Sequence, residues 1–322
     1  MHQKISYFAP LSPSDFERIR GTRERILAAA KAPNTRSTYR SGWRIFERWC
    51  IAAEHAALPA ERATVEEFML WSIADGYRLG TVAVRLSAIA AMHIASGYSS
   101  PIDEQLRELL SCARREIRED RRGKRALTYE LLARVAMRLP HTPGGIRDRA
   151  MVLTGFASGW RRSEIVAIAL SHVEFCPEGF SLWQPRSKTD QRSEGRLVGI
   201  ARGTEPGTCP VRALEAWLAV RGKWEGPLFV RLDFRGQLTR QAIGQRGERL
   251  AVRLKEELAS LGEDPAHYGA HSLRAGMITE AAKAGATEAA IMQRTGHRSR
   301  QTLLRYIRPA TIFDFDPLKN VL

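Results

Sequence analysis

The sequence predicts a mainly α-helical protein of two domains, an N-terminal helical bundle and a mixed α/β domain with a small antiparallel sheet. Three observations support this fold class. Apolar residues recur at spacings of three and four up to residue 117, as they do in amphipathic helices. The stretch EDRRGKR, residues 119–125, contains no apolar residue and indicates a linker. Beyond it, helical segments flank short strand-like runs around Pro177 and Gly179.

The first domain is expected to form four helices. A helix that starts at Thr35 would carry apolar side chains on one face, namely Tyr39, Trp43, Phe46 and Cys50. A second helix is predicted from Thr64, whose hydroxyl has capping-box spacing to the Glu67 carboxylate. A third spans residues 81–94. The fourth follows Asp103 and would close a small bundle with Leu106, Leu109, Leu110, Ala113 and Ile117.

The composition shift near the linker predicts three segments: a first domain at residues 1–120, a basic linker at 121–126 and a second domain at 127–322. In the second domain we predict helices at 129–138, 146–156, 162–169, 211–220 and 240–261, strands near Val173 and at 181–184 and 196–200, and several short helices from 271 to 306.

The charge balance points to a polyanionic partner. Among 322 residues there are 50 Lys and Arg against 35 Asp and Glu, a formal net charge of +15. Each phosphate contact releases condensed counterions and so drives association at moderate salt, which makes a nucleic acid the simplest partner for such an excess of positive charge. Ribosome-associated and membrane-surface proteins are also basic, so the charge alone leaves those classes open.

Two groups of basic residues could contact such a partner. Arginines recur every four residues on the polar side of the first helix, at Arg36, Arg40, Arg44 and Arg48. This arginine ridge suits either a surface that follows phosphates or an ordinary solvated face. The linker contributes Arg121, Arg122, Lys124 and Arg125, which would hold phosphates as it crosses a duplex.

Several other classes of protein are not indicated. No run of about 18 apolar residues occurs, and the first residues lack the apolar core of a signal peptide, so we expect a cytoplasmic protein without a membrane span. The cysteines have neither CxxC nor Cys/His ligand spacing, and they are Cys50, Cys112, Cys176 and Cys209. We therefore expect reduced cysteines, no disulfide framework and no zinc site.

Four separated motifs in the second domain carry groups suited to chemistry on an anion. They are Arg161 in GWRRSEI, Lys188 in the polar hairpin RSKTD, His271 and Arg274 in HSLR, and His297 in TGH, with Tyr306 nine positions later in LLRY. Taken singly, each of these residues is more often structural. Two of the motifs nevertheless have features that favour anion binding. One places an arginine at the start of a helix, and the other places a histidine and an arginine on the same helix face.

The order of these motifs resembles that of the tyrosine recombinase, or phage integrase, family, and HSLRAG and IMQRTGH resemble its Cre-like and lambda-integrase-like members. The resemblance implies a catalytic set of Arg161, Lys188, His271, Arg274, His297 and Tyr306, with Glu164 as a supporting acid. The N-terminal helices resemble the family's core-binding, SAM-like domain, so the two domains would form a clamp round DNA. A threonine before the glycine of TGH and an alanine after Arg274 depart from the family pattern without removing a functional group.

The resemblance implies a site-specific DNA recombinase that needs no metal, no ATP and no other cofactor. Its tyrosine would attack a phosphodiester and store the bond energy in a 3′-phosphotyrosine, while two guanidinium groups neutralise charge on the phosphate. The implied roles are Tyr306 as nucleophile, Arg161 and Arg274 as phosphate ligands, Lys188 as general acid, His271 as base or phosphate ligand, His297 as hydrogen-bond donor, and Glu164 as a residue that orients His271 or an arginine.

Strand exchange joins two duplexes, so the resemblance also implies a tetramer on double-stranded DNA that carries an inverted-repeat site. The C-terminal tail, residues 312–322, carries too much apolar surface to be left in water at a terminus, through Ile312, Phe313, Phe315, Leu318, Val321 and Leu322. By resemblance this tail would dock on a neighbouring protomer. Packing on its own domain accounts for the same residues equally well.

Three rival functions would use some of the same sequence features. A type IB topoisomerase shares the catalytic set, but the chain length and the N-terminal helices favour a recombinase. A DNA-binding regulator that has lost catalysis is disfavoured because the set is intact. A metal-dependent nuclease is disfavoured because no cluster of carboxylates lies near the motifs.

Overall fold

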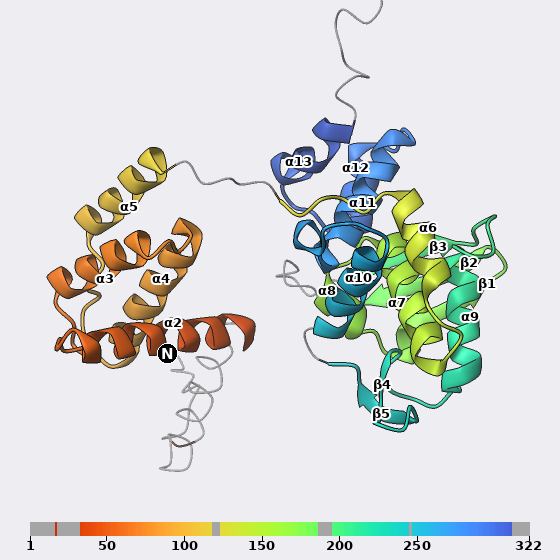
Figure 1. Cartoon of the computed structure of the whole chain (residues 1–322), viewed down its shortest axis with the longest axis horizontal. Coiled ribbons are helices and arrows are strands. Elements are labelled where there is room, and N and C mark those ends of the chain that lie inside the picture. The colour runs from red at the N-terminus through yellow and green to blue at the C-terminus, as the bar shows by residue number, and fades with distance from the viewer. Residues whose placement is uncertain (1–16, 18–32, 118–122, 186–194, 245–246, 311–322) are drawn as a thin grey trace, which may run out of the picture. The chain divides into compact units, whose positions relative to one another are not determined.

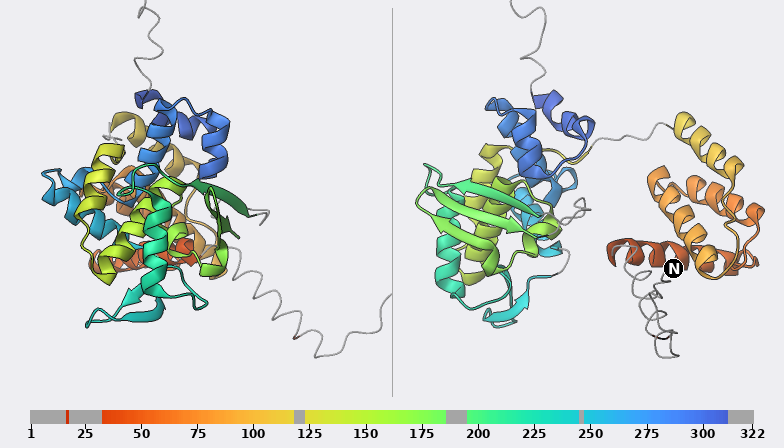
Figure 2. Two further views of the ribbon diagram at one scale, coloured as in Figure 1. Left: turned by 90° about the vertical axis from the view of Figure 1, so that its right-hand side faces the viewer. Right: turned by 180° about the vertical axis from the view of Figure 1, so that it is seen from behind.

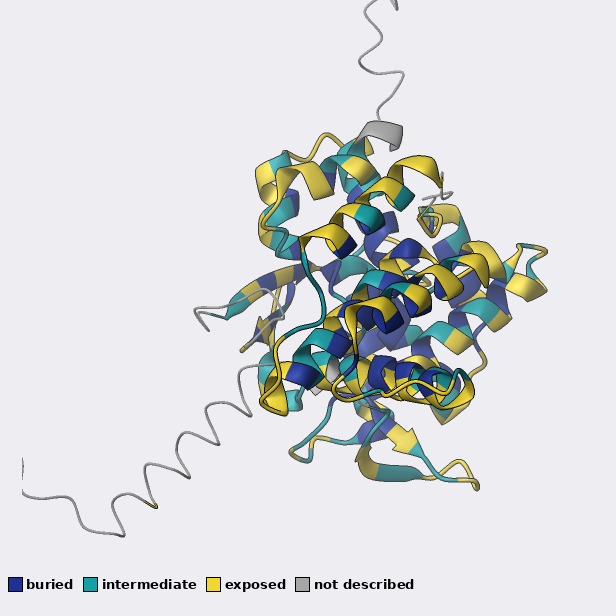
Figure 3. Ribbon diagram, turned by 90° about the vertical axis from the view of Figure 1, so that its left-hand side faces the viewer, coloured by how far each residue is buried: buried dark blue, intermediate teal, exposed yellow. Residues whose placement is uncertain are grey.

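The structure, a computed structural model, describes residues 17, 33–117, 123–185, 195–244 and 247–310. The chain divides into two compact units, Met1–Arg121 and Arg122–Leu322. Each unit has its own hydrophobic core. In Figure 3 the helices carry exposed residues on one side and buried residues on the other, as expected for amphipathic helices around a core.

The described part of the first unit consists of helices α2 (Pro33–Ala52), α3 (Arg62–Ala74), α4 (Leu79–Ala95) and α5 (Glu104–Glu116). The predicted apolar face of α2 is confirmed, because Trp43, Phe46 and Cys50 are all buried in the core of this unit. Asp103 caps α5 by accepting a hydrogen bond from the Leu106 amide at 2.9 Å. Four helices thus enclose one apolar core, as the sequence predicts.

Two details of the first unit differ from prediction. Helix α3 begins at Arg62, not at Thr64, and its N-cap residue Glu61 makes no side-chain capping bond. Thr64 is buried inside the helix and Glu67 instead contacts His55, so the predicted capping box is wrong. Ile117 follows α5 as an extended C-cap residue that is 38% exposed, and it does not belong to the core face.

The second unit is built around helix α7 (Pro143–Ser158), which packs against α9 (Pro210–Arg221) and α11 (Ala270–Lys283). Helix α6 (Tyr129–Arg138) and the short α8 (Arg162–Val166) precede and follow α7 along the chain. The predicted helix over 162–169 is shorter than expected, because Ala169 pairs with Pro227 in an isolated bridge. The 3₁₀ turn η1 (Leu170–His172) then leads into the sheet.

The predicted small antiparallel sheet is present, and Figure 2 shows it on one side of the second unit. Its strands are β1 (Val173–Cys176), β2 (Gly179–Gln184) and β3 (Arg196–Ala201), in the order β1-β2-β3. Phe180, Leu182, Val198 and Ile200 alternate along β2 and β3 and are buried in the core. Gln184, the last residue of β2, pairs with Arg196, the first residue of β3.

The predicted helix over 240–261 is wrong in its first part. Residues 238–242 form strand β5 (Leu238–Ala242), which pairs with β4 (Val230–Leu232), and helix α10 (Glu248–Ser260) begins only after Gly247. Gly244 and Gly247 both have positive φ, a conformation that interrupts a helix. In Figure 1 this hairpin lies at the end of the second unit opposite α11 and α13.

The C-terminal part of the second unit contains α11, α12 (Glu288–Thr295) and α13 (Arg300–Ala310), as Figure 1 shows at the top of that unit. They share a small core of Met277, Ile278, Ile291 and Leu303, against which Tyr306 and Ile307 pack. The 3₁₀ turn η2 (Pro265–His267) precedes α11. Within the described residues, no helix is both long enough and apolar enough to cross a bilayer.

Candidate active site

Arg161 is held in place by the carboxylate of Glu164. Gly159 ends α7 in the left-handed conformation with φ 63°, and Arg161 is then the N-cap residue of α8. The Glu164 carboxylate accepts hydrogen bonds from the Arg161 amide at 2.8 Å and from its Nη1 at 2.7 Å. The Glu164 side chain is 7% exposed and that of Arg161 is 28% exposed. The guanidinium is therefore anchored on one side and accessible to an anion on the other.

Arg274 is a second guanidinium in the same place, and it is almost fully buried. Its Nη1 donates to the Gly159 carbonyl at 2.7 Å, and its Nη2 lies 3.2 Å from both ring nitrogens of His297. Burial, and next the charge of Arg161, lowers the pKa of Arg274 to about 10. At neutral pH it remains a cation, so two positive charges converge beside the end of α7.

His297 is held as a neutral ring. Gly296 ends α12 in the left-handed conformation with φ 67° and so turns the chain toward the two arginines. Thr295 Oγ1 donates to the Ile291 carbonyl at 2.6 Å and therefore accepts from His297 Nδ1 at 2.7 Å. That assignment leaves Nε2 to accept from Arg274. Burial and then the charges of Arg274, Arg161, His271 and Arg196 lower the pKa of His297 to about 4.

Tyr306 and His271 form a hydrogen-bonded pair. His271 lies in the first turn of α11 and Tyr306 in α13, and their Nε2 and Oη atoms are 2.7 Å apart. Desolvation, followed by the charges of Arg274 and Arg161, lowers the pKa of His271, so the ring is neutral at pH 7. A neutral imidazole at this distance can accept the phenol proton. The ring of Tyr306 also lies 6.2 Å from that of His297, between centroids.

The structure thus brings five of the six predicted catalytic residues into one cluster, which comprises Arg161, His271, Arg274, His297 and Tyr306. The sixth, Lys188, lies outside the described residues. The predicted acid Glu164 contacts arginines, and the described hydrogen bonds do not join it to His271. Two guanidinium groups, two neutral imidazoles and a phenol can bind a phosphate ester and attack it.

Two arginines near this cluster were not predicted as site residues. Arg196 opens β3 and lies 3.8 Å from Glu164 through its Nη2. Arg294 donates from Nη1 to the Ala157 carbonyl and from Nη2 to the Gly199 carbonyl, both at 2.6 Å, and so ties α12 to α7 and β3. A charged residue at the first position of a core strand was the one sequence signal for Arg196.

The predicted DNA-binding residues lie on exposed positions where the structure describes them. All four arginines of the arginine ridge are exposed on α2, namely Arg36, Arg40, Arg44 and Arg48. In the linker, the Lys124 ammonium donates to the Ala266 carbonyl and the Arg125 amide to the His267 carbonyl. These two residues therefore attach to the second unit at η2. Arg121, Arg122 and the tail 312–322 lie outside the described residues.

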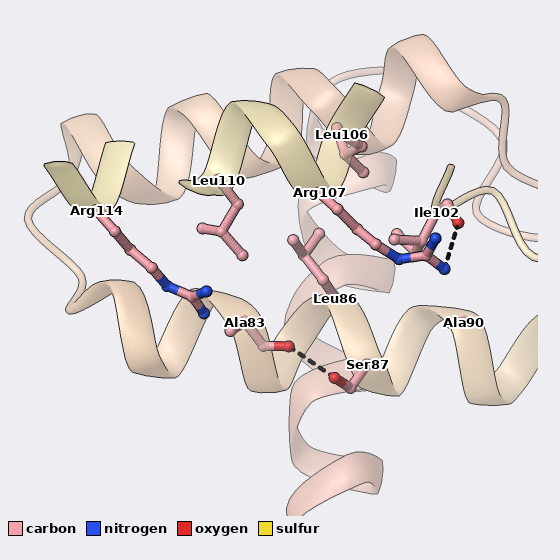
Figure 4. Close-up of a pocket in the computed structure, with 9 residues that line it drawn as sticks. All are labelled: Ala83, Leu86, Ser87, Ala90, Ile102, Leu106, Arg107, Leu110 and Arg114. Atoms are coloured by element: carbon pink, nitrogen blue, oxygen red, sulfur yellow. Dashed lines mark hydrogen bonds between the residues drawn. The ribbon is translucent and has the colours of Figure 1, made fainter. Parts of the chain in front are cut away.

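A hollow of about 380 Å³ lies in the first unit between α4 and α5, and Figure 4 shows its lining. Leu86, Leu106 and Leu110 supply apolar surface, and Arg107 and Arg114 extend over it from α5. Arg107 is bonded to the Ile102 carbonyl at 3.2 Å. None of the catalytic candidates that the structure describes lines the hollow. Among the residues that the structure describes, no group of three or more His, Cys, Asp or Glu side chains could hold a metal ion.

Comparison with known proteins agrees with this geometry. The family model described as "Phage integrase family" matches residues 127–311. The chain is 32% identical over 310 residues to an integrase/recombinase xerD homolog of Selenomonas ruminantium, covering 95% of this chain and 90% of the relative. It is 25% identical to the recombinase cre of Escherichia phage P1, over 82% of this chain and 81% of the relative.

Solved structures share the fold. A lambda integrase dimer bound to a COC′ core site superimposes with a TM-score of 0.58 at 15% sequence identity, covering 90% of this chain and 94% of that one. At this level of identity the similarity concerns the fold. It agrees with the mainly helical architecture and the small antiparallel sheet of the second unit.

Proposed function

The chain belongs to the phage integrase family and is a tyrosine-type site-specific recombinase, and we propose that Tyr306 is the nucleophile of its cleavage step. The observation that carries this proposal is the 2.7 Å contact between Tyr306 Oη and His271 Nε2, beside two arginines. The phenol proton passes to a neutral His271 as the oxygen attacks. The contact is made within one chain, so the tyrosine acts on the phosphate held by its own protomer.

The cleavage step exchanges one phosphodiester for another. Tyr306 Oη forms a bond to phosphorus while the bond to the 5′-oxygen breaks, which leaves a 3′-phosphotyrosine and a 5′-hydroxyl. Lys188, in the hairpin between β2 and β3, supplies the proton that the 5′-oxygen takes up. Attack by a 5′-hydroxyl of a second strand reverses these steps and rejoins the DNA. The bond count is conserved, so the step consumes no ATP.

The negative charge that develops on the phosphate is neutralised by side chains that other residues already hold in position. Arg161 and Arg274 neutralise the non-bridging oxygens, and their anchors on Glu164 and Gly159 keep them from having to reorganise during the reaction. His297 is an acceptor for Arg274 in the free protein. A bound phosphate offsets the arginine charges, and it favours the protonated ring that donates to a phosphate oxygen.

Double-stranded DNA with inverted-repeat arms is the proposed partner. Support comes from the net charge of +15 and from the exposed arginine ridge on α2. In this proposal the residues 1–120 and 127–322 act as the two halves of a clamp, joined by the basic linker 121–126. Four protomers assemble on two sites, with the tail 312–322 as the element that joins neighbours. The enzyme acts on DNA in the cytoplasm.

A strand-exchange assay tests the proposal and separates its rivals. A binding site is first selected from random duplexes, and two DNAs that carry it are then incubated with the protein in EDTA and without ATP. Joined recombinant strands, absent with Tyr306→Phe, are expected. Relaxation of supercoils at any sequence without exchange would favour a topoisomerase, and binding without breakage would favour a regulator.

A further inference from the structure

We propose that Thr295 is a positioning residue for cleavage: its hydroxyl keeps one proton on Nδ1 of His297, so that Nε2 is the nitrogen that becomes protonated and donates to a phosphate oxygen. The inference rests on the proposed function, because it concerns the hydrogen bond from His297 to the phosphate. It assigns a role to the threonine of TGH, a position at which the sequence departs from the family pattern.

The Thr295 side chain has neighbours that hold it in one orientation. Thr295 is the last residue of α12 and is fully buried. Its Oγ1 lies 2.6 Å from the carbonyl oxygen of Ile291, one turn earlier in the same helix. A Cβ placed on Gly159 would lie 3.1 Å from Thr295 Cγ2, so the methyl group packs against the Gly159 backbone. Both branches of the side chain are therefore occupied, and its rotamer is fixed.

The direction of the hydrogen bonds at Thr295 fixes the proton on His297. A hydroxyl has one proton to donate and two lone pairs that accept. Two acceptor oxygens do not approach to 2.6 Å without a proton between them, so the Thr295 proton is used in the bond to the Ile291 carbonyl. Only lone pairs then remain for His297 Nδ1, which lies 2.7 Å from Oγ1 and must carry the proton itself.

The contact of His297 with Arg274 does not decide which ring nitrogen is protonated. Nη2 of Arg274 lies 3.2 Å from Nδ1 and 3.2 Å from Nε2, so it can donate to either nitrogen. Arginine has no acceptor, and it therefore binds whichever nitrogen is bare. With the Thr295 hydroxyl present, the bare nitrogen is Nε2. Without that hydroxyl, Nδ1 can accept from Arg274 and the neutral ring carries its proton on Nε2.

The position of this proton matters when a phosphate binds. Charged or titratable groups from four elements face His297, and they are Arg161 at the start of α8, His271 and Arg274 of α11, Arg196 of β3 and Tyr306 of α13. The three arginines keep the ring neutral until an anionic phosphate offsets their charge. The ring then becomes a cation, and both of its N–H groups need acceptors. Thr295 already accepts from Nδ1, so the second proton enters at Nε2 and bonds a phosphate oxygen without a rotation of the ring.

The first measurement locates the ring proton of His297 in the free protein at neutral pH. In protein labelled with ¹⁵N-histidine, Nε2 couples to both carbon-bound ring protons and Nδ1 mainly to one, so NMR distinguishes the two nitrogens. The signals of His297 are those that are absent from His297→Phe. We expect the proton on Nδ1 in wild type and in Thr295→Ser, which keeps the hydroxyl. In Thr295→Val, which has the same shape without the hydroxyl, we expect it on Nε2.

The second measurement is the rate of covalent adduct formation on a saturating nicked suicide duplex that carries the selected site. Thr295→Val should be about tenfold slower than wild type, which is the difference between a charge-assisted and a neutral hydrogen bond to the phosphate. Thr295→Ser keeps the acceptor and should react within about threefold of the wild-type rate. In the His297→Phe background the change to valine should have no further effect, because the hydroxyl acts through the imidazole.

Thr154→Val is the matched control. Thr154 is also a fully buried threonine, in α7, and its hydroxyl has no hydrogen-bond partner among the described residues. This variant should leave both the position of the His297 proton and the rate of adduct formation as they are in wild type. An equal loss of rate in Thr154→Val and Thr295→Val would show a general effect of removing a buried hydroxyl, and it would overturn the inference.

The remaining failures can be told apart. A wild-type His297 that carries its proton on Nε2 overturns the inference without any Thr295 variant. So does a Thr295→Val protein that keeps the proton on Nδ1, reacts as fast as wild type, or loses as much rate again in the His297→Phe background. A Thr295→Ser protein as slow as Thr295→Val shows that the methyl group matters and not the hydroxyl, which overturns it too.

Folding failures do not leave the inference open. Thr295→Ala replaces Thr295→Val if the valine variant does not fold, and His297→Gln replaces His297→Phe on the same terms. If neither Thr295→Val nor Thr295→Ala folds, the hydroxyl serves folding and the inference is overturned. In each of these cases wild type still forms the adduct, and the proposed function stands. If wild type forms no adduct, the proposed function fails and the inference fails with it, wherever the ring proton lies.

Discussion

Replacing Arg274 by lysine should slow cleavage far more than it weakens DNA binding. The buried guanidinium donates through Nη1 to the Gly159 carbonyl and through Nη2 to His297, and its remaining donors are those that could reach a phosphate. Lysine keeps the positive charge but carries a single ammonium group. It cannot bond the Gly159 carbonyl and a phosphate oxygen in the fixed fork geometry of arginine.

The magnitude follows from the two interactions that are lost. Losing one preorganised donor to a developing oxyanion typically costs about 100- to 1,000-fold in rate. A buried carbonyl left without a partner costs about 1–3 kcal/mol of stability. The second unit spans Arg122–Leu322, and for a unit of this size each kcal/mol lowers Tm by about 2–4 °C, so we expect Arg274→Lys to melt about 2–12 °C lower.

The assay is single-turnover formation of the covalent adduct on a nicked duplex, well below the Tm of either variant. Arg221→Lys is the matched control, because Arg221 is equally buried and its hydrogen bonds to described residues go to the Pro227, Gly222 and Trp224 carbonyls, outside the cluster. It should lose similar stability and cleave at close to the wild-type rate. The reasoning is refuted if Arg274→Lys cleaves within tenfold of wild type, or if Arg221→Lys is slowed as much.

Three further predictions concern charge. The pKa of His297 is lowered from 6.5 to about 4 in the folded protein. As the pH falls from 6.5 to about 4, the unfolded chain therefore binds a proton at this residue and the folded chain does not. The stability that is present above pH 6.5 is lost over this range. Between pH 6.5 and about pH 4, the free energy of unfolding of wild type should fall by about 1–2 kcal/mol more than that of His297→Gln. The value is reduced for solvent screening because the ring is only partly buried. Equal losses for the two proteins in denaturant titrations would contradict this prediction. Glu164→Gln removes the charged acceptor of the Arg161 amide and Nη1, and we expect a loss of about 2 kcal/mol in stability and about tenfold in cleavage rate. A variant that melts and cleaves like wild type would show that Glu164 does not anchor Arg161. The double variant Arg40→Ala/Arg44→Ala should bind DNA with a weaker salt dependence. The slope of the logarithm of the DNA-binding constant against the logarithm of salt concentration should fall in magnitude by about 1.8, at about 0.9 per phosphate contact. An unchanged slope would mean that the arginine ridge does not contact DNA.

The helices that depend on apolar periodicity were predictable from the sequence, and the paired contacts between distant residues were not. Trp43, Phe46 and Cys50 are buried on one face of α2 because their spacing alone decides which way they point. The sequence predicts a helix from residue 240, but residues 240–242 belong to strand β5, since so few residues before Gly244 and Gly247 give too little periodicity to separate a strand from a helix. Thr64 had the spacing of a capping residue, but the helix starts earlier and buries it.

The residues of the site were predictable from the sequence, but the hydrogen bonds among them could be seen only in the folded structure. The order of the motifs pointed to Arg161, His271, Arg274, His297 and Tyr306. Nothing local in the sequence tells that Thr295 fixes the proton on His297, because that depends on where its hydroxyl donates. Arg196 contacts Gln184, Glu164 and Gly296, which lie far from one another along the chain.

The central claim is that Tyr306 becomes covalently attached to DNA. The most direct measurement is incubation of wild type and Tyr306→Phe with a nicked suicide duplex that carries the selected site, without metal or ATP, followed by a denaturing gel and peptide mapping of the adduct. The account predicts a protein–DNA band with wild type that maps to Tyr306, and no such band with Tyr306→Phe although it still binds the duplex. An adduct that persists in Tyr306→Phe, or maps to another residue, would contradict it.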